Sequence, residues 1–368
     1  MYNSFNMKNE FAEILENIEN SLKKSLPEKT NVEWQQKTFR ELSDCVKDEH
    51  FENLIKPCRS LMDLGGKRWR PILLVLCSEL CRESKKNAPL TLEQTYDVTP
   101  LVEFVHTASL IHDDIEDSAE TRRGKPAAHI SFGLDVALNA GSWLYFVAPE
   151  TIDSLKVSTE FKNQLYALYT QELRRLHLGQ AMDIYWHINP HLFPTVQEYT
   201  QMVHLKTGTL ASLAVQTGFL AGGATRQEAL EMGKVAAALG EGFQILDDVQ
   251  NLTTGNPGKK RGDDIVEGKK SLPVLLHVQK NPDDKEKIAE FFAKAAKEGI
   301  DSPAVEQCIK LLEESDAIQI AQKKGTETIE KNIEILANVF GSANSSKSAK
   351  LIKELFEEMI LKFKAEKR

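Results

Sequence analysis

The stretch from Leu101 to Pro126, LVEFVHTASLIHDDIEDSAETRRGKP, decides the fold of this chain. Its first part, Leu101 to Ile111, has apolar residues at helical spacing, which predicts a buried helix. The helical pattern then breaks into an acidic run in which Asp113 and Asp117 are four positions apart. Side chains at that spacing share one face of a helix, so we expect two stacked carboxylates. Such a pair repels itself and raises its own pKa values unless a cation is bound.

A second acidic motif lies in GEGFQILDDVQNLTTG. Its polar residues recur at spacings of three and four, while apolar residues occupy the other positions; they are Gln244, Asp247, Asp248 and Asn251. They form one polar stripe on an otherwise buried helix, where unpaired charges are costly. Hard oxygen ligands of this kind suit Mg²⁺. Either motif alone is more simply a solvated acidic helix end, but two such helices facing each other would form a magnesium site.

Helical periodicity extends over most of the remaining chain. Further helices are expected over Leu92 to Ile111, Lys162 to Trp186, Gln197 to Leu220 and Gln227 to Leu252. Gly, Pro, Asn and Asp cluster between them, as turns require, and alternating strand patterns are scarce. The fold class predicted is therefore all-α, with a single large helical bundle. We expect residues 1–50 to be an N-terminal helical extension of uncertain placement and residues 51–368 to form the main domain.

Composition excludes several classes of protein. The chain has 368 residues and a formal net charge of −8, which argues against a general nucleic-acid binder. We find neither a transmembrane run of about 20 apolar residues nor the pattern of a secretory signal. Five cysteines are an odd number, and Cys77 and Cys81, one helical turn apart, are expected to be packing residues. A reducing, cytoplasmic location fits best.

Basic residues flank both acidic motifs. Lys67 and Arg70 lie in GGKRWRP, where glycines and a helix start favour anions. Arg122 and Arg123 follow the first motif directly. Lysines also follow the second motif, at Lys259, Lys260, Lys269 and Lys270. Each alone is more simply a surface charge, except Lys206, whose apolar surroundings suggest that it reaches an anion.

Together these motifs resemble the trans-isoprenyl diphosphate synthase, or polyprenyl synthetase, family. The matching segments are GGKRWRP, HTASLIHDDIEDSAETRRGKP, GQAMD, KTG, FQILDDVQN and GKK, in the family's order between Lys56 and Pro273. Within that family the sequence is most similar to the geranylgeranyl diphosphate synthase branch. The resemblance implies an all-α bundle around a deep central pocket, a homodimer, and magnesium-dependent joining of isopentenyl diphosphate to an allylic diphosphate.

The resemblance also implies the roles of individual residues. Asp113 and Asp117 would bind two magnesium ions and Asp247 a third when substrate is present, with Asp114 and Asp248 in or next to the ligand shell. Isopentenyl diphosphate would be bound by Lys67, Arg70, His106 and Arg123. The allylic diphosphate would be bound by Arg122, Lys206, Thr207, Gln244, Lys259 and Lys269. Thr207 and Gln180 would lie near the forming carbocation. The catalytic set would be Asp113, Asp114, Asp117, Lys206, Asp247 and Asp248.

Two positions bear on how the chain differs within the family. Asn251 stands where most members have aspartate, and an amide is a weaker magnesium ligand than a carboxylate. Ala108 and Ser109 are small where members that stop at fifteen carbons carry bulky residues. A twenty-carbon product is therefore expected. A deeper floor of the pocket would come from His129, Trp143, Tyr145 and Phe146, although any one of these could simply pack a core or dimer contact.

Three alternatives remain beside this interpretation. The chain could make a longer polyprenyl diphosphate, or it could be a terpene cyclase or head-to-head prenyl synthase on the same fold. It could also be a non-catalytic partner subunit of another synthase. The cyclase and head-to-head enzymes do not need the isopentenyl site implied by Lys67, Arg70, His106 and Arg123.

Overall fold

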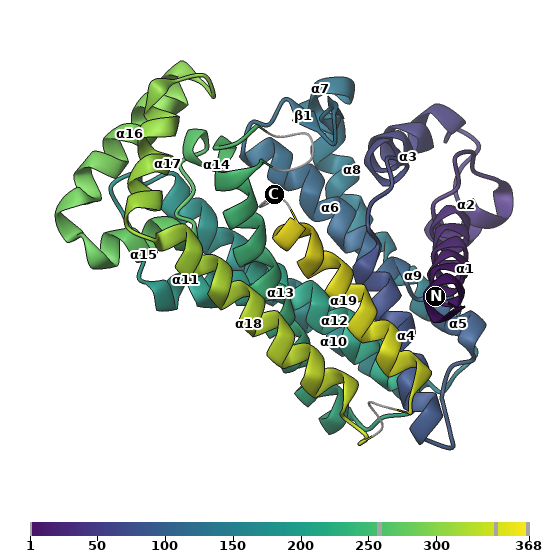
Figure 1. Cartoon of the computed structure of the whole chain (residues 1–368). Helices are drawn as coiled ribbons and strands as arrows, with labels where there is room; N and C mark the ends of the chain where they lie inside the picture. The colour runs from purple at the N-terminus through teal and green to yellow at the C-terminus, as the bar shows by residue number, and fades with distance from the viewer. Residues whose placement is uncertain (1, 256–259, 342–344, 366–368) are drawn as a thin grey trace. The chain divides into compact units, whose positions relative to one another are not determined.

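The computed structural model describes residues 2–255, 260–341 and 345–365. Apart from two strands of two residues each, the regular elements in this part of the chain are helices (Figure 1). The all-α prediction is thus confirmed. None of the described helices is both long and apolar enough to cross a bilayer.

The chain forms two compact units. Unit 1 comprises Met1–Thr170 and Leu213–Leu230, and unit 2 comprises Gln171–Ser212 and Glu231–Arg368. Helices α10 (Thr159–His187), α12 (Thr209–Ala221) and α13 (Arg226–Thr253) contribute residues to both. The remaining elements of unit 1 are α1 (Tyr2–Ser25), α2 (Val32–Phe39), α3 (Asp48–Met62), α4 (Trp69–Ser84), α5 (Leu92–Asp97), α6 (Pro100–Glu116), β1 (Thr121–Arg122), β2 (Lys125–Pro126), α7 (Ala128–Phe132), α8 (Leu134–Val147) and α9 (Glu150–Asp153).

In unit 1 the helix of the first motif, α6, packs against α3, α4 and α8. The N-terminal helix α1 also packs in this unit, against α4, α5 and α6. Its buried residues Ile14, Ile18 and Leu22 recur every fourth position, which makes one apolar stripe along the helix. The expected extension of residues 1–50 therefore begins with a helix that belongs to the core of unit 1.

One expected helix is divided in two. The periodicity from Leu92 to Ile111 predicted a continuous helix, but α5 ends at Asp97 and α6 begins at Pro100. Proline lacks an N–H and disfavours the helical conformation in the residue before it, so Thr99 lies outside both helices. Cys77 and Cys81 are fully buried in α4, and both are free thiols, which agrees with a packing role.

Unit 2 is built around the helix of the second motif, α13. Its apolar residues Ile245, Val249 and Leu252 lie in one buried cluster with Tyr199 and Phe292. The other elements of this unit are α11 (Val196–Val203), the π-helix η1 (His204–Gly208), α14 (Asp263–Val266), α15 (Leu272–Lys280), the 3₁₀ helix η2 (Pro282–Asp284), α16 (Lys285–Glu298), α17 (Pro303–Glu314), α18 (Ala317–Ala337) and α19 (Lys347–Ala365). The last two, α18 and α19, pack side by side (Figure 1).

Candidate active site

The first acidic motif forms the C-terminal turn of α6. The sequence predicted that this helix breaks after Ile111, but it continues through Glu116, with Asp117 as its C-cap. The carbonyl end of a helix carries partial negative charge and favours cations. Carboxylates concentrated there are mutually destabilising, so this turn is a place where a bound cation would be stabilised.

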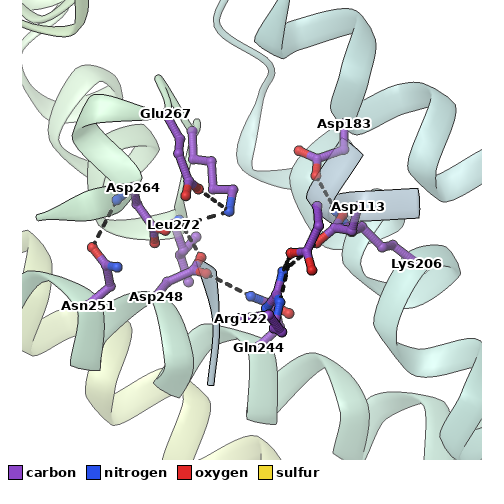
Figure 2. A network of polar contacts seen from close by, with 12 residues as sticks. Asp113, Arg122, Asp183, Lys206, Gln244, Asp248, Asn251, Asp264, Glu267 and Leu272 are labelled. Atoms are coloured by element: carbon purple, nitrogen blue, oxygen red, sulfur yellow. Dashed lines mark hydrogen bonds and ion pairs between the residues drawn. The ribbon is translucent and has the colours of Figure 1, made fainter. Parts of the chain in front are cut away.

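Adjacent aspartates of this motif have different surroundings. The Asp113 side chain is 20% exposed, whereas that of Asp114 is 2% exposed. Arg122 Nε donates a 2.7 Å hydrogen bond to Asp114 Oδ1, and a second guanidinium nitrogen contacts the same oxygen. Burial raises the pKa of Asp114, and Arg122 opposes that rise. Arg122 also lies 3.9 Å from Asp113 (Figure 2).

A tight hairpin places the two arginines that follow the motif. Strands β1 and β2 pair with Arg122 opposite Lys125, and the two residues between them have positive φ, 52° at Arg123 and 74° at Gly124. A two-residue turn of this type requires positive φ at both positions. Arg122 and Arg123 are thereby held at the end of a short, regular turn. Arg123 Nη1 donates a hydrogen bond to the carbonyl of Gly65.

The GGKRWRP loop is anchored by its central arginine. Arg68 has φ 45°, and its side chain is 1% exposed. It donates hydrogen bonds to Glu19 at 2.7 Å, to Glu103 at 2.6 Å and to the carbonyl of Met62 at 2.6 Å. A buried charge is tolerated when it is paired and hydrogen-bonded in this way. The anchor leaves Lys67, one residue earlier, exposed to solvent.

Three of the four residues predicted to bind isopentenyl diphosphate belong to one electrostatically coupled group. Burial, together with the charges of Arg70 and Arg123, holds the pKa of His106 well below its usual range, so this imidazole is neutral at pH 7. Arg70 stacks on Trp69, 4.4 Å from the ring centroid. Its Nε is buried and has no hydrogen-bond partner among the described residues. Burial lowers the pKa of Arg70 to about 10, which still leaves it cationic.

In unit 2 a lysine–aspartate pair stands beside an irregular turn. Lys206 lies in the π-helix η1, and its ammonium donates a 2.6 Å hydrogen bond to Asp183 of α10 (Figure 2). π-helical turns occur frequently at functional sites. Gly179 permits the close approach of the two helices, because a Cβ at this position would collide with the backbone of Leu205 and Lys206. Gln180, one residue further along α10, is half-buried.

A chain of hydrogen bonds runs through the second acidic motif. Thr207 Oγ1 donates to Gln244 at 3.0 Å, and Gln244 Nε2 donates to Asp248 at 3.0 Å. The buried Asp248 also accepts the Tyr199 hydroxyl at 2.6 Å. It accepts the Leu272 backbone N–H at 3.4 Å as well (Figure 2). Burial raises the pKa of Asp248 to about 6. Asp247, the preceding residue, is exposed.

The other residues predicted after the second motif have separate outcomes. Lys269 contacts the Glu267 carboxylate and lies 3.7 Å from that of Asp264. Asn251 is fully buried, and its side chain bonds to the backbone of Asp264. Lys259 lies outside the described residues.

The residues predicted to set product length differ in burial. Ala108 is fully buried, and Ser109 donates to the carbonyl of His106 at 2.8 Å. Tyr145 is also buried, but Phe146 is 80% exposed, so its side chain does not lie in the interior of this chain.

Two aromatic residues from the same prediction have different neighbours. Trp143 stacks on Phe39 with ring centroids 6.2 Å apart, and it packs edge-on against Trp34 with ring centroids 6.4 Å apart. This arrangement is typical of core packing. His129 is half-buried, and its Nδ1 lacks a hydrogen-bond partner in the described part of the chain.

The carboxylates fit magnesium in number and type. Within residues 2–255, 260–341 and 345–365, no three His, Cys, Asp or Glu side chains gather into a complete metal-binding group. Mg²⁺ is usually held by one or two carboxylates, with substrate phosphates and water supplying the other oxygens. Asp113 and Asp117 in unit 1 offer two such carboxylates, and Asp247 in unit 2 offers another.

Sequence reasoning missed several partners of the predicted residues. Asp183 lies in the motif GQAMD, yet its pairing with Lys206 was not foreseen. The sequence also offered no reason to single out three further residues, because each fits the ordinary pattern of an amphipathic helix or a basic loop; they are Tyr199, Arg68 and Glu103. The available signal was a charged or hydroxyl group at a position that the periodicity assigns to the core, as at Glu103.

Solved structures with the same arrangement of helices establish the class of fold. Geranylgeranyl pyrophosphate synthetase from Pyrococcus horikoshii superposes with a TM-score of 0.78 and 26% identity, over 96% of this chain and 98% of that one. Heptaprenyl diphosphate synthase from Staphylococcus aureus superposes with a TM-score of 0.72 and 24% identity, over 95% of this chain and 98% of that one. The fold is therefore the all-α fold of isoprenyl diphosphate synthases.

Sequence comparison identifies the family. A model described as polyprenyl synthetase matches residues 51–312. The geranylgeranyl pyrophosphate synthase of Neocamarosporium betae is 36% identical over 243 residues, 66% of this chain and 66% of that protein. Geranylgeranyl pyrophosphate synthase 2 of Zymoseptoria tritici is 36% identical over 209 residues, which are 56% of this chain and 59% of that protein. The chain belongs to the polyprenyl synthetase family, and it covers less than two thirds of the length of these two relatives.

Proposed function

We propose that this protein is a magnesium-dependent prenyltransferase that joins isopentenyl diphosphate head to tail to an allylic diphosphate. The observation that carries the proposal is the combination in unit 1 of accessible carboxylates at the end of α6 with the cationic group of Arg70, Arg122 and Arg123. Carboxylates and guanidinium groups on neighbouring elements suit a magnesium diphosphate, in which metal and anion must both be bound. The similarity to geranylgeranyl pyrophosphate synthases supports the same reaction.

The metal would be held by Asp113, Asp117 and Asp247, with three ions in the substrate complex. When bound, magnesium neutralises a diphosphate and makes it a better leaving group. Asp114 and Asp248 would act differently, since both are buried and bonded to protein groups. We assign them the role of holding Arg122 and Gln244 in place for the substrate.

The two substrates would use separate sets of residues. Lys67, Arg70, His106 and Arg123 would bind isopentenyl diphosphate, with the neutral His106 donating one N–H. The allylic diphosphate would be bound by Arg122, Lys206, Thr207, Gln244, Lys259 and Lys269. In this scheme Lys206 is paired with Asp183 in the substrate-free protein, and a bound diphosphate would compete with Asp183 for the ammonium.

The reaction breaks the allylic carbon–oxygen bond and leaves an allylic carbocation. The double bond of isopentenyl diphosphate attacks this cation, a carbon–carbon bond forms, and the proton that is lost passes to the released diphosphate. Protein groups contribute by positioning the two diphosphates and stabilising the charge of the leaving one. Water must be excluded while the cation exists, and the buried Ala108 and Tyr145 suit an apolar channel.

We propose a twenty-carbon main product, because Ala108 and Ser109, one helical turn before the first motif, have small side chains. A homodimer and a cytoplasmic location belong to the same proposal. Five free cysteines support a reducing compartment.

A labelled-substrate assay tests the function. Purified protein is incubated with magnesium, labelled isopentenyl diphosphate and farnesyl diphosphate, and the products are separated by chain length. We expect geranylgeranyl diphosphate. Longer prenyl chains would show that the proposed product length is wrong. A cyclised or head-to-head hydrocarbon would show that the proposed reaction class is wrong. No incorporation of label would indicate a non-catalytic subunit.

A further inference from the structure

Asn251, the residue that departs from the usual family pattern, lies in the last turn of α13 and is fully buried. Its side-chain Oδ1 accepts the backbone N–H of Asp264 at 3.1 Å. Its backbone carbonyl accepts the N–H of Gly262 at 2.8 Å. One residue of the second motif therefore bonds twice to the start of α14, and Figure 2 shows the bond from its side chain to Asp264.

These bonds fix the orientation of the Asn251 amide. A buried backbone N–H needs an acceptor, so the amide oxygen must face Asp264. The Nδ2 group then occupies the other side, where it is buried without a hydrogen-bond partner within the described residues. An NH₂ group has only donors and offers a cation no lone pair. In this orientation Asn251 turns its oxygen toward α14 and its nitrogen elsewhere.

The segment that Asn251 holds leads directly to Lys269. Gly262 has φ +87° and is packed so closely against Val305 that a Cβ would collide with it. After α14, the backbone N–H of Lys269 returns to the carbonyl of Asp264 at 2.8 Å. The Lys269 ammonium contacts the carboxylate of Glu267, which lies in the same segment, and is 3.7 Å from the carboxylate of Asp264. Asp264 is thus bonded to Asn251 on one side and to Lys269 on the other.

We propose that Asn251 is a positioning residue that docks the segment Gly262 to Lys269 on α13 and so places the Lys269 ammonium for the diphosphate. It does not act as a metal ligand. The inference rests on the proposed function only in naming diphosphate as the group that Lys269 binds.

Two substitutions separate docking from metal binding. Asn251→Asp retains an acceptor for the Asp264 N–H but introduces a carboxylate, a better magnesium ligand than an amide. If Asn251 were a metal ligand, this change would lower the magnesium concentration for half-maximal effect. Docking predicts that this concentration stays within about twofold and that the melting temperature falls, because a charge is buried without a paired cation. Asn251→Ala removes the acceptor altogether.

For Asn251→Ala we expect faster tryptic cleavage after Lys260 or Arg261 in substrate-free protein, by about fivefold or more. We also expect a KM for the allylic diphosphate raised about tenfold, with the magnesium dependence unchanged. Thr253→Ala, an exposed position two residues further along the helix, is the matched control and should behave as wild type. Asp247→Asn is the metal control and should require more magnesium.

Magnesium binding is followed by Mn²⁺ electron paramagnetic resonance in the presence of inorganic diphosphate, as well as by activity. Tighter Mn²⁺ binding in Asn251→Asp, or unchanged proteolysis in Asn251→Ala, would overturn the proposal. Proteolysis needs no substrate, so faster cleavage in a protein that makes no prenyl product would leave the docking role standing and reject the synthase function alone.

Discussion

The two acidic motifs are alike in one respect and different in another. In each, the second of two adjacent aspartates is buried and bonded to protein, while the first is more exposed: Asp114 against Asp113, and Asp248 against Asp247. Consecutive residues on a helix point about 100° apart, so both cannot face the same ligand. The pairs are not interchangeable carboxylates, and each combines an accessible group with a structural one.

The difference lies in what neutralises the buried carboxylate. Asp114 is paired with a cation, Arg122, whereas Asp248 is held by the neutral donors of Tyr199, Gln244 and the Leu272 backbone. The first motif should therefore respond to loss of charge, and the second to loss of hydrogen bonds.

The largest effect is expected within the first pair. Asp113→Asn should reduce turnover about 10²- to 10³-fold with little change in melting temperature, because this carboxylate is accessible and has a predicted metal role. Asp114→Asn should reduce the melting temperature as well, since it breaks the buried pair with Arg122. Steady-state kinetics and differential scanning calorimetry measure the two effects. Equal melting temperatures for both variants would remove the distinction between the members of the pair.

A smaller effect separates the cations of the two units. Arg70→Ala should raise the KM for isopentenyl diphosphate about tenfold, a loss of about 1.4 kcal/mol. Lys206→Ala should do the same for the allylic substrate. Asp183→Asn is the control for Lys206, because it removes the ion pair while keeping the ammonium. If both alanine variants weakened both substrates equally, the assignment of separate substrate sites would be lost.

Product length tests whether the face of α6 before the motif lines the growing chain. Ala108→Phe should shorten the main product by one five-carbon unit, which chromatography of the extracted products measures. Ala108 is fully buried, so we also expect overpacking to lower the free energy of unfolding by about 1–3 kcal/mol. A folded variant, judged by circular dichroism, that still makes the wild-type product would show that this face lies away from the channel.

The smallest effect concerns a buried cation in unit 2. Arg68 in unit 1 has two carboxylate partners, whereas Lys270 bonds to the Gly268 carbonyl and lies near the rings of Phe193 and Phe292. Burial lowers the pKa of Lys270 to about 8 from 10.5. Between these two pH values the folded state binds fewer protons than the unfolded state. The free-energy cost of burying the charged Lys270 is therefore full below pH 8 and decreases as pH rises toward 10.5.

Lys270→Met should accordingly raise the melting temperature by about 2–4 °C at pH 7 and by less at pH 10. Calorimetry at both pH values measures the difference. Lys260→Met, at an exposed position, controls for the loss of one positive charge. A gain that is the same at both pH values would contradict a buried, charged Lys270.

The sequence predicted the elements better than the contacts between them. Periodicity located α10 and α13 within a few residues, and the resemblance to the family identified the charged residues of both acidic motifs. Periodicity did not predict the break before Pro100, where one proline interrupts an otherwise continuous apolar pattern. Nor did it place α1, whose packing depends on helices that follow much later in the chain.

Partners distant in sequence were beyond local reasoning. Glu19 and Arg68 are 49 residues apart, and Tyr199 and Asp248 are also 49 apart. No spacing rule links such positions, because tertiary packing alone brings them together. Asn251 is the clearest case: the sequence presents it as a weakened metal ligand, but its side chain is buried and accepts the backbone N–H of Asp264 in α14.

The central claim is that accessible carboxylates and nearby cations bind magnesium and diphosphate together. Calorimetry of the protein with magnesium, with inorganic diphosphate and with both tests it without requiring turnover. We predict that both ligands together raise the melting temperature by more than the sum of their separate effects, and that Asp113→Asn and Asp247→Asn abolish this excess. Additive effects in the wild-type protein, or an excess that survives in both variants, would contradict the account.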